Sequence, residues 1–187
     1  NILPVFLGLN AAFMGLFIIA SYIFLDKDEG TIRAFAVTPA TVGQYLMSKM
    51  GVMLVAGLMS GLVATIFIAG TKAHYFHLIV LLIACNAFGS ALGLFIASFF
   101  NTMVKAMGWL YLSVIVLAFA AVSYYMPAFS PIVIRILPSY PMLFAFRETL
   151  YEVGNLSYVY YNVLGFTGAA IVFFLLANWR FKKTLTV

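Results

Sequence analysis

The chain has 187 residues, of which 65% are hydrophobic and only 8% are charged. A soluble domain is about half apolar and about a quarter charged, so ten basic and five acidic side chains cannot cover a soluble body of this size. Disorder is excluded as well, because it requires low hydrophobicity and high charge. The single Cys85 leaves no intrachain disulfide and no Cys-based zinc cluster. The composition predicts an integral membrane protein whose basic residues serve topology and anionic lipid headgroups, with no role in nucleic-acid binding.

Five apolar stretches are long enough to cross a membrane as helices. A hydrocarbon core about 30 Å thick needs roughly 20 apolar residues, and continuous apolar runs fit helices better than barrel strands, which alternate over about ten residues. We therefore expect an all-α membrane protein with one transmembrane domain over residues 1–187. Its predicted spans are residues 2–25, 50–70, 78–100, 107–126 and 158–179.

Basic residues between the spans predict the orientation of the chain. If the C-terminal tail is cytoplasmic, the cytoplasmic segments hold seven Lys and Arg residues and the external segments hold three, as the positive-inside rule requires. Because the chain begins at Asn1 inside an apolar segment, we expect a further span upstream. The cytoplasmic set is Lys27, Arg33, Lys49, Lys105, Arg180, Lys182 and Lys183, and the external set is Lys72, Arg135 and Arg147.

Polar residues within the spans are few and form no catalytic set. All five carboxylates lie outside the spans, whereas a proton- or sodium-coupled carrier normally keeps ionisable groups near the midplane. Asn10 and Asn86 are interpreted as interhelical hydrogen-bond partners. His74 and His77 have no third ligand near them in sequence, so no metal site is expected. No nucleophile–base arrangement and no G-x-x-x-x-G-K-[ST] loop is present, so neither enzymatic activity nor ATP binding of that kind is expected.

Two G-x-x-x-G patterns predict places where helices pack closely. Gly57 and Gly61 lie in the second span, and Gly89 and Gly93 lie in the third. Small residues four apart allow two helix backbones to approach each other.

Residues 26–49 are predicted to contain a short amphipathic helix. Asp26, Asp28 and Glu29 suit the positive end of such a helix. An apolar stripe at i, i+3 and i+4 follows, with one basic residue off that face. The stripe is Ile32, Phe35 and Ala36, and the basic residue is Arg33.

Two signals compete for the start of the next helix. Thr38-Pro39 fits an N-cap followed by proline at the first helical position. Thr41-x-x-Gln44 fits a capping box. Either start leads through Tyr45 and Lys49 into the membrane, and the amphipathic helix before it either binds a cytoplasmic partner or simply lies at the membrane interface.

The segment of residues 127–157 is apolar but contains four prolines, which exclude one continuous helix. We expect short re-entrant or interfacial helices on the external side. Backbone of this kind is tolerated where protein buries it or a cavity adjoins it.

Three motifs together resemble the type 2 ABC-exporter permease family (ABC-2). Asp28-Glu29-Gly30-Thr31, followed by Thr38-Pro39 and Tyr45-Leu46-x-x-Lys49, resembles its E-x-G-T…TP…K stretch. Gly93-Leu94-x-x-Ala97-Ser98-Phe99-Phe100-Asn101 resembles the end of its fourth span. Pro138-x-x-Pro141 with Phe146-Arg147 resembles its external re-entrant segment.

The resemblance implies six spans, of which this chain holds the last five. It implies a coupling helix that docks on cytoplasmic ATP-binding-cassette subunits, which bind ATP and Mg, whereas this chain binds no cofactor. By matching position, the coupling residues are Glu29, Gly30, Thr31, Ile32, Arg33, Phe35, Ala36, Thr38 and Pro39, and the external gate residues are Pro138, Pro141, Arg147 and Glu148.

The transporter implied is a dimer with a second permease copy or a paralogue, in the plasma (inner) membrane of a bacterium or archaeon. A hydrophobic or amphipathic substrate such as a drug, lipid or natural product is expected to pass near Asn10, Phe13, Phe17 and Tyr111. The alternatives are a stand-alone channel or secondary transporter, a membrane-embedded enzyme, and a non-transporting anchor subunit.

Overall fold

The computed structural model describes residues 2–31, 41–126, 129, 131–150 and 155–185, and for residues 12–14, 184 and 185 it describes the backbone alone. All secondary structure in the described part is helical. Five helical stretches are long and apolar enough to cross a membrane, which confirms the predicted fold class. They are Leu3–Asp28, Val42–Lys72, Tyr75–Ala97, Met103–Tyr125 and Leu156–Lys183.

The first span is a composite of α1 (Leu3–Ala12), a π-helical turn (Phe13–Ile18) and α2 (Ile19–Asp28). A 3-10 turn (Gly70–Lys72) follows the second span, and two short helices precede the last one. The remaining helices are α4 (Val42–Ala69), α5 (Tyr75–Ala97), α6 (Met103–Tyr125), α7 (Ile132–Ile136), α8 (Ser139–Leu150) and α9 (Leu156–Leu185).

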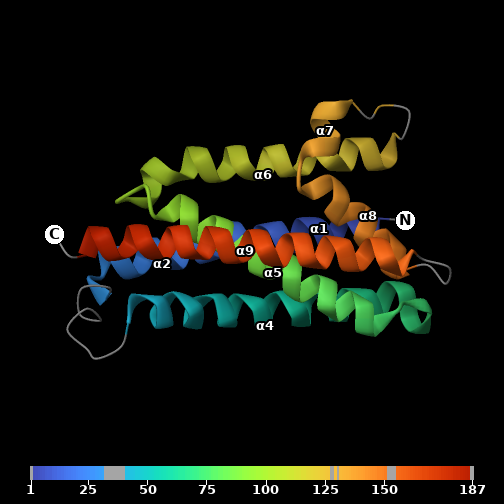
Figure 1. Cartoon of the computed structure of the whole chain (residues 1–187), viewed down its shortest axis with the longest axis horizontal. Helices are drawn as coiled ribbons and strands as arrows, with labels where there is room; N and C mark the ends of the chain where they lie inside the picture. The colour runs from blue at the N-terminus through green and yellow to red at the C-terminus, as the bar shows by residue number, and fades with distance from the viewer. Residues whose placement is uncertain (1, 32–40, 127–128, 130, 151–154, 186–187) are drawn as a thin grey trace.

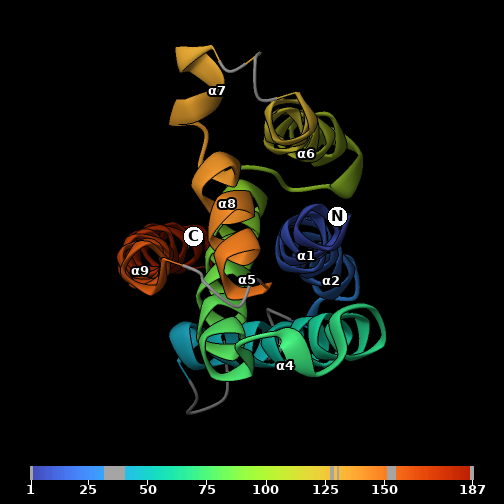
Figure 2. The ribbon, with the colours of Figure 1, turned by 90° about the vertical axis from the view of Figure 1, so that its right-hand side faces the viewer.

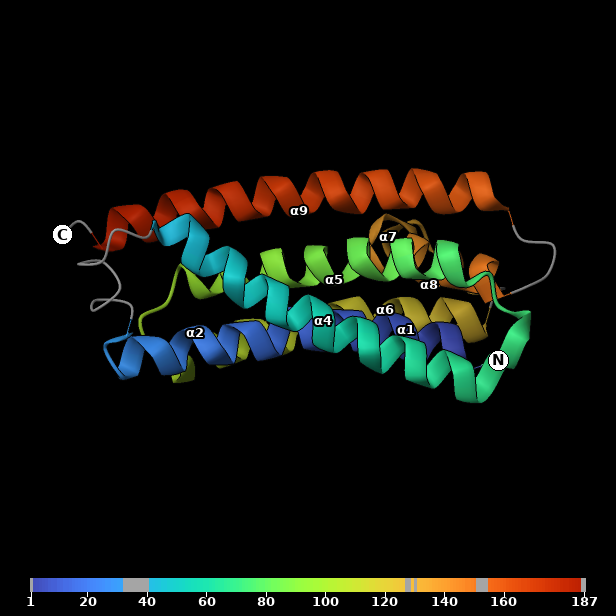
Figure 3. The ribbon, with the colours of Figure 1, turned by 90° about the horizontal axis from the view of Figure 1, so that it is seen from below.

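The long helices run lengthwise, so the chain has two distinct ends (Figure 1). The end of α2, the start of α4, the turn between α5 and α6, and the C-terminus lie together at what we call the C-terminal end. The N-terminus, the turn between α4 and α5, and helices α7 and α8 lie at the opposite, N-terminal end (Figure 3). This arrangement groups the described basic residues as the sequence predicted. Which end faces the cytoplasm stays a prediction.

Helix α5 lies at the centre of the bundle, with the first span, α4, α8 and α9 around it (Figure 2). Its contact with the first span is made by backbone. A Cβ atom at Gly93 would lie 2.4 Å from the Leu16 carbonyl oxygen, and one at Gly89 would lie 2.8 Å from the Ala11 carbonyl oxygen. On the other helix, a Cβ at Gly15 would lie 2.6 Å from the Ser90 nitrogen. The close approach predicted from Gly89 and Gly93 is confirmed.

Helix α4 packs on α5 through the G-x-x-x-G pattern formed by Gly57 and Gly61. A Cβ at Gly57 would lie 2.0 Å from Asn86 Oδ1, and one at Gly61 would lie 2.9 Å from Leu82 Cδ2. The buried Asn86 amide donates to the Leu82 carbonyl of its own helix at 2.8 Å, so its interpretation as an interhelical donor is wrong. Asn10 does link two spans, because its Nδ2 donates to Ser60 Oγ at 2.8 Å.

Helix α9 lies along α5 and is joined to it by aromatic side chains. Phe88 contacts Phe166 and Phe173, with ring centroids 5.3 and 6.1 Å apart, and Phe95 contacts Phe173 at 5.4 Å. The outward surfaces of α4, α6 and α9 carry exposed apolar side chains. Such surfaces can face lipid, because apolar side chains have no polar group that would lose a hydrogen bond with water there.

The polar segment between the first two spans is shorter than the sequence predicted. The first span continues to Asp28, where Gly30 with φ +72° ends the helix in the left-handed conformation that glycine adopts without strain. Asp26 and Asp28 therefore close the first span, and the prediction that they open the short amphipathic helix is wrong. The Thr41-x-x-Gln44 capping box starts α4 with both of its hydrogen bonds. Residues Thr38 and Pro39, the competing start, lie outside the described residues.

The proline-containing segment of residues 127–157 contains the predicted short helices, α7 and α8. Pro138 stands just before α8 and Pro141 lies in its first turn, where a missing N–H costs no intrahelical hydrogen bond. Helix α8 is buried against the first span, α5, α6 and α9. Met142, Ala145 and Phe146 belong to the same core cluster as Leu81 and Phe88 of α5.

We expect Gly93→Ala to lower the free energy of unfolding by about 1–3 kcal/mol, because its methyl group must displace the backbone of the first span. Gly168→Ala is the matched control, since Gly168 lies on a membrane helix with no atom near its Cβ position. It should leave stability unchanged or raise it slightly through helix propensity. Thermal unfolding in detergent tests the pair. Equal midpoints for the two variants would contradict the backbone contact.

Candidate functional site

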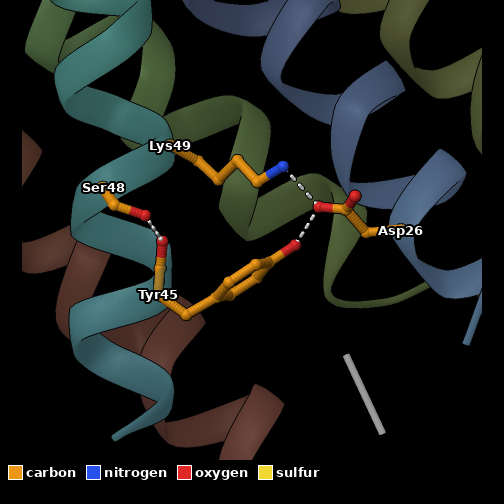
Figure 4. A network of polar contacts seen from close by, with 4 residues as sticks. All are labelled: Asp26, Tyr45, Ser48 and Lys49. Carbon is orange, nitrogen blue, oxygen red and sulfur yellow. Dashed lines mark hydrogen bonds and ion pairs between the residues drawn. The ribbon is translucent and has the colours of Figure 1, made fainter. Parts of the chain in front are cut away.

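The last turn of α2 carries a buried carboxylate that is held by α4. Asp26 is 7% exposed, and its Oδ2 lies 2.7 Å from the Lys49 ammonium. The Tyr45 hydroxyl donates a hydrogen bond to the same oxygen (Figure 4). Ser48 Oγ donates to the Tyr45 carbonyl at 2.7 Å within α4. Two side chains of α4 thus bind one oxygen of α2.

The surroundings of Lys49 strengthen this contact. Its ammonium lies 5.7 Å from the centre of the Tyr22 ring and 5.6 Å from the centre of the Tyr45 ring, distances at which a cation is attracted to an aromatic face. The Lys49 side chain is 29% exposed and that of Asp26 is 10% exposed, so water screens the ion pair less than it would a surface pair. The contact fixes α2 and α4 to each other at the two ends of residues 29–41.

The next residue, Lys27, faces the other way and holds α5 and α9. Its ammonium donates to the carbonyl oxygens of Ala97 at 2.9 Å and Phe100 at 2.6 Å. Ala97 is the last residue of α5 and Phe100 lies in the turn that follows it. Unpaired acceptors and the helix dipole favour a cation at the C-terminal end of a helix. The same ammonium lies 4.9 Å from the Phe24 ring and 5.2 Å from the Phe181 ring of α9. Asp26 and Lys27 together form what we call the α2 hub.

The end of α9 adds a further contact beside the hub. The Arg180 guanidinium carbon lies 3.8 Å from the centre of the Phe99 ring, in the turn after α5. Helices α2, α4, α5 and α9 are therefore joined by charged and aromatic side chains at the C-terminal end. These contacts link α2 to the other three helices at this level.

The predicted coupling residues adjoin the hub directly. Glu29 and Thr31 are exposed, and Gly30 is half-buried. The other members of the predicted set, Ile32, Arg33, Phe35, Ala36, Thr38 and Pro39, lie outside the described residues. The segment that contains them begins three residues after Asp26 and ends four residues before Tyr45.

The predicted gate residues lie at the opposite end, Pro138 just before α8 and Pro141, Arg147 and Glu148 on it. Arg147 is exposed. Glu148 Oε2 accepts a hydrogen bond from the Asn155 backbone N–H at 2.8 Å, which ties the end of α8 to the start of α9. The carbonyl oxygen of Thr149 accepts from the His74 backbone N–H at 2.9 Å. Helix α8 is thus attached to the turn before α5 and to α9.

The predicted substrate-path residues do not converge on one surface. Phe17 and Tyr111 lie together, with ring centroids 5.3 Å apart, between the first span and α6. Asn10 is directed instead to Ser60 of α4. The side chain of Phe13 lies outside the described atoms. A narrow apolar cavity is lined by residues of the first span, α5, α6 and α8, among them Gly8, Leu117 and Leu143, but not by Asn10, Phe17 or Tyr111.

The α2 hub is not predicted from the sequence, where Asp26 is assigned to the start of an amphipathic helix and Lys27 to the cytoplasmic basic residues. A sequence signal for the contact exists, because the oppositely charged Asp26 and Lys49 flank the segment between the first two spans. Among the described residues, no three His, Cys, Asp or Glu side chains gather to hold a metal ion.

Comparison with known proteins identifies the family. A family model described as "Fluoroquinolones export permease protein Rv2686c-like" matches residues 1–177. The chain therefore belongs to the Rv2686c-like family of export permeases and is the membrane-embedded component of a transporter. No curated protein and no solved structure matched the chain.

A double-mutant cycle tests the ion pair of the hub. Asp26→Asn and Lys49→Met should each lower the free energy of unfolding by about 1–3 kcal/mol, because each leaves the other, partly buried charged group without an opposite charge beside it. The double variant should cost clearly less than the sum of the two. Ser48→Ala, which removes only a local hydrogen bond of α4, serves as the control. Additive losses measured by denaturant unfolding in detergent would show that the pair is not coupled.

Proposed function

We propose that this export permease is the membrane-spanning subunit of an ATP-driven exporter of the ABC-2 type. ATP and Mg would be bound by separate cytoplasmic ABC ATPase subunits, and this chain would perform no covalent chemistry. A second permease, identical or paralogous, would complete the transport path. The C-terminal end of the bundle would face the cytoplasm of a bacterium or archaeon, as its excess of basic residues favours.

The observation that carries this proposal is the α2 hub. A coupling segment is useful only if force applied to it reaches the transmembrane helices. Residues 29–41 connect α2 to α4, and Asp26 and Lys27, just before them, bind α4 on one side and α5 with α9 on the other. The sequence that resembles the family's coupling motif therefore begins where four helices are joined.

The mechanism follows from these contacts. When ATP closes the ATPase subunits, they push on residues 29–41, and the hub passes the displacement to α4, α5 and α9 together. The bundle then changes from inward- to outward-facing and releases its cargo outside. The external helix α8, held by the first span, α5, α6 and α9, would move with them and serve as the gate.

The substrate is proposed to be hydrophobic or amphipathic. The family description names fluoroquinolones, which are flat aromatic compounds with a carboxylate and commonly a basic amine. The half-buried Phe17 and the exposed Tyr111 would provide aromatic faces for a ring system of this kind. Asn10, against α4, would provide a polar contact if the first span and α4 separate during transport.

A stand-alone channel or secondary transporter is the alternative. An ion-coupled carrier normally binds its ion with a carboxylate near the membrane midplane. The sequence has no Asp or Glu between residues 30 and 147, and the ionised groups of the described spans lie in the turns near helix ends. This distribution favours an external energy source such as ATP.

Two glycine variants test the coupling role. Gly30 with φ +72° and Gly70 with φ +57° are both glycines with no atom near the Cβ position, and they lie at opposite ends of the bundle. Alanine at Gly30 should strain the backbone by about 1–2 kcal/mol, and alanine at Gly70, whose ψ of −133° lies outside the left-handed helical region, should strain it at least as much. Only Gly30→Ala should reduce substrate-stimulated ATPase activity of the purified transporter several-fold, because only it alters the exit from α2 toward the ATPase. Equal effects of the two variants would contradict a coupling segment at residues 29–41.

The same preparation separates the two candidate functions. An ATPase that co-purifies with the permease and is stimulated by a fluoroquinolone supports the exporter. If no ATPase co-purifies and the permease alone moves the compound across vesicle membranes, the ATP-driven proposal fails and the secondary transporter replaces it.

A further inference from the structure

Both tryptophans of the chain mark the same level of the bundle. Trp109 in the second turn of α6 is 59% exposed, and Trp179 near the end of α9 is 62% exposed. Each lies one helical turn from a lysine that is nearer the C-terminal end, Lys105 on α6 and Lys183 on α9. Indole rings favour the interface between hydrocarbon and headgroups, and lysines reach outward to the phosphates. The pairs locate the membrane boundary at this end.

The end of α9 also has two contacts between a basic side chain and an aromatic ring. The Lys183 ammonium lies 5.7 Å from the centre of the Trp179 ring. Arg180 stacks at 3.8 Å on the half-exposed Phe99. When the face of a guanidinium lies on an aromatic ring, its N–H donors still point outward in the guanidinium's own plane. In this geometry they can bind a phosphate through two hydrogen bonds. Two cations thus lie beside two exposed aromatic rings at the level of the lipid phosphates.

The charge of α9 is entirely positive. The helix carries Arg180, Lys182 and Lys183, and the sequence has no Asp or Glu after Glu152. Among the described residues, the C-terminal end of the bundle has six basic residues (Lys27, Lys49, Lys105, Arg180, Lys182 and Lys183) and three acidic ones (Asp26, Asp28 and Glu29). This net positive charge makes the end of α9 complementary to an anion from outside the chain.

An apolar strip continues from this surface toward the middle of the membrane. Val172, Leu175 and Leu176 are exposed on α9 and precede Trp179 by one to two turns, on the same side of the helix. The surface thus offers cations for a headgroup, an indole at the level of the glycerol, and apolar side chains for an acyl chain.

We propose that the end of α9, with Phe99 of the α5–α6 turn, is a binding site for an anionic phospholipid of the phosphatidylglycerol class. Arg180 and Lys183 bind the phosphate, and the acyl chain lies along Val172 and Leu175. Because Arg180 stacks on the turn after α5, and Lys27 binds the carbonyls of that same turn, the lipid stabilises the joint between α5 and α9. The site does not depend on the ATP-driven mechanism.

Quenching of Trp179 fluorescence tests this site. In a Trp109→Phe background Trp179 is the remaining tryptophan, and lipids with brominated acyl chains quench it when they bind beside it. The permease in detergent should bind brominated phosphatidylglycerol more tightly than brominated phosphatidylcholine. Each basic residue near such a surface contributes about fivefold in affinity, so Arg180→Gln with Lys183→Gln should reduce the preference roughly 25-fold.

Three controls make the result specific. Lys72→Gln, at an exposed lysine of the opposite end, should leave the preference unchanged. Lys183→Gln alone, at an exposed position, should reduce it about fivefold even if the Arg180 variant fails to fold. Inorganic phosphate at millimolar concentration should not compete with the lipid. The proposal is overturned if the double variant keeps the preference, if Lys72→Gln loses it equally, or if free phosphate abolishes it.

Discussion

The fold depends on the contact of two backbones, that of the first span and that of α5. At Gly15, Gly89 and Gly93 no side chain separates the helices, and a single added methyl group would approach the facing backbone to between 2.4 and 2.8 Å. Close contact at the glycine positions leaves few side chains between the two helices, so we expect a displacement of one helix to move the other. Helix α9 is attached to this pair through phenylalanine side chains.

The α2 hub uses the geometry of a helix to connect this pair to its neighbours. Consecutive residues on a helix point about 100° apart, so Asp26 and Lys27 face different partners from one turn. Asp26 binds two side chains of α4, whereas Lys27 satisfies carbonyls at the end of α5 and contacts a ring of α9. Each partner is polar or aromatic, so both buried charges are compensated and the turn is stable in a largely apolar setting.

Local signals in the sequence identified most of the fold but little of the hub. Apolar length located the five spans, the Thr41–Gln44 capping box located the start of α4, and the paired glycines located the helix contacts. These features depend on neighbours in the chain. The hub depends on contacts between residues 19 to 73 positions apart, such as Asp26 with Tyr45 and Lys27 with Phe100. The end of the first span was misplaced because charged residues normally mark a loop, whereas here burial and pairing keep Asp26 within the helix.

The central pair of helices also links the two ends of the bundle. The backbones of the first span and α5 are in contact, and at the N-terminal end α8 packs on both helices. Gly8 of the first span lets Leu143 of α8 approach so closely that a Cβ there would lie 2.7 Å from its side chain, and Phe146 is fully buried in the cluster with Phe88. In the proposed ATP-driven mechanism, a displacement at residues 29–41 would reach α8 through the packing of the first span and α5.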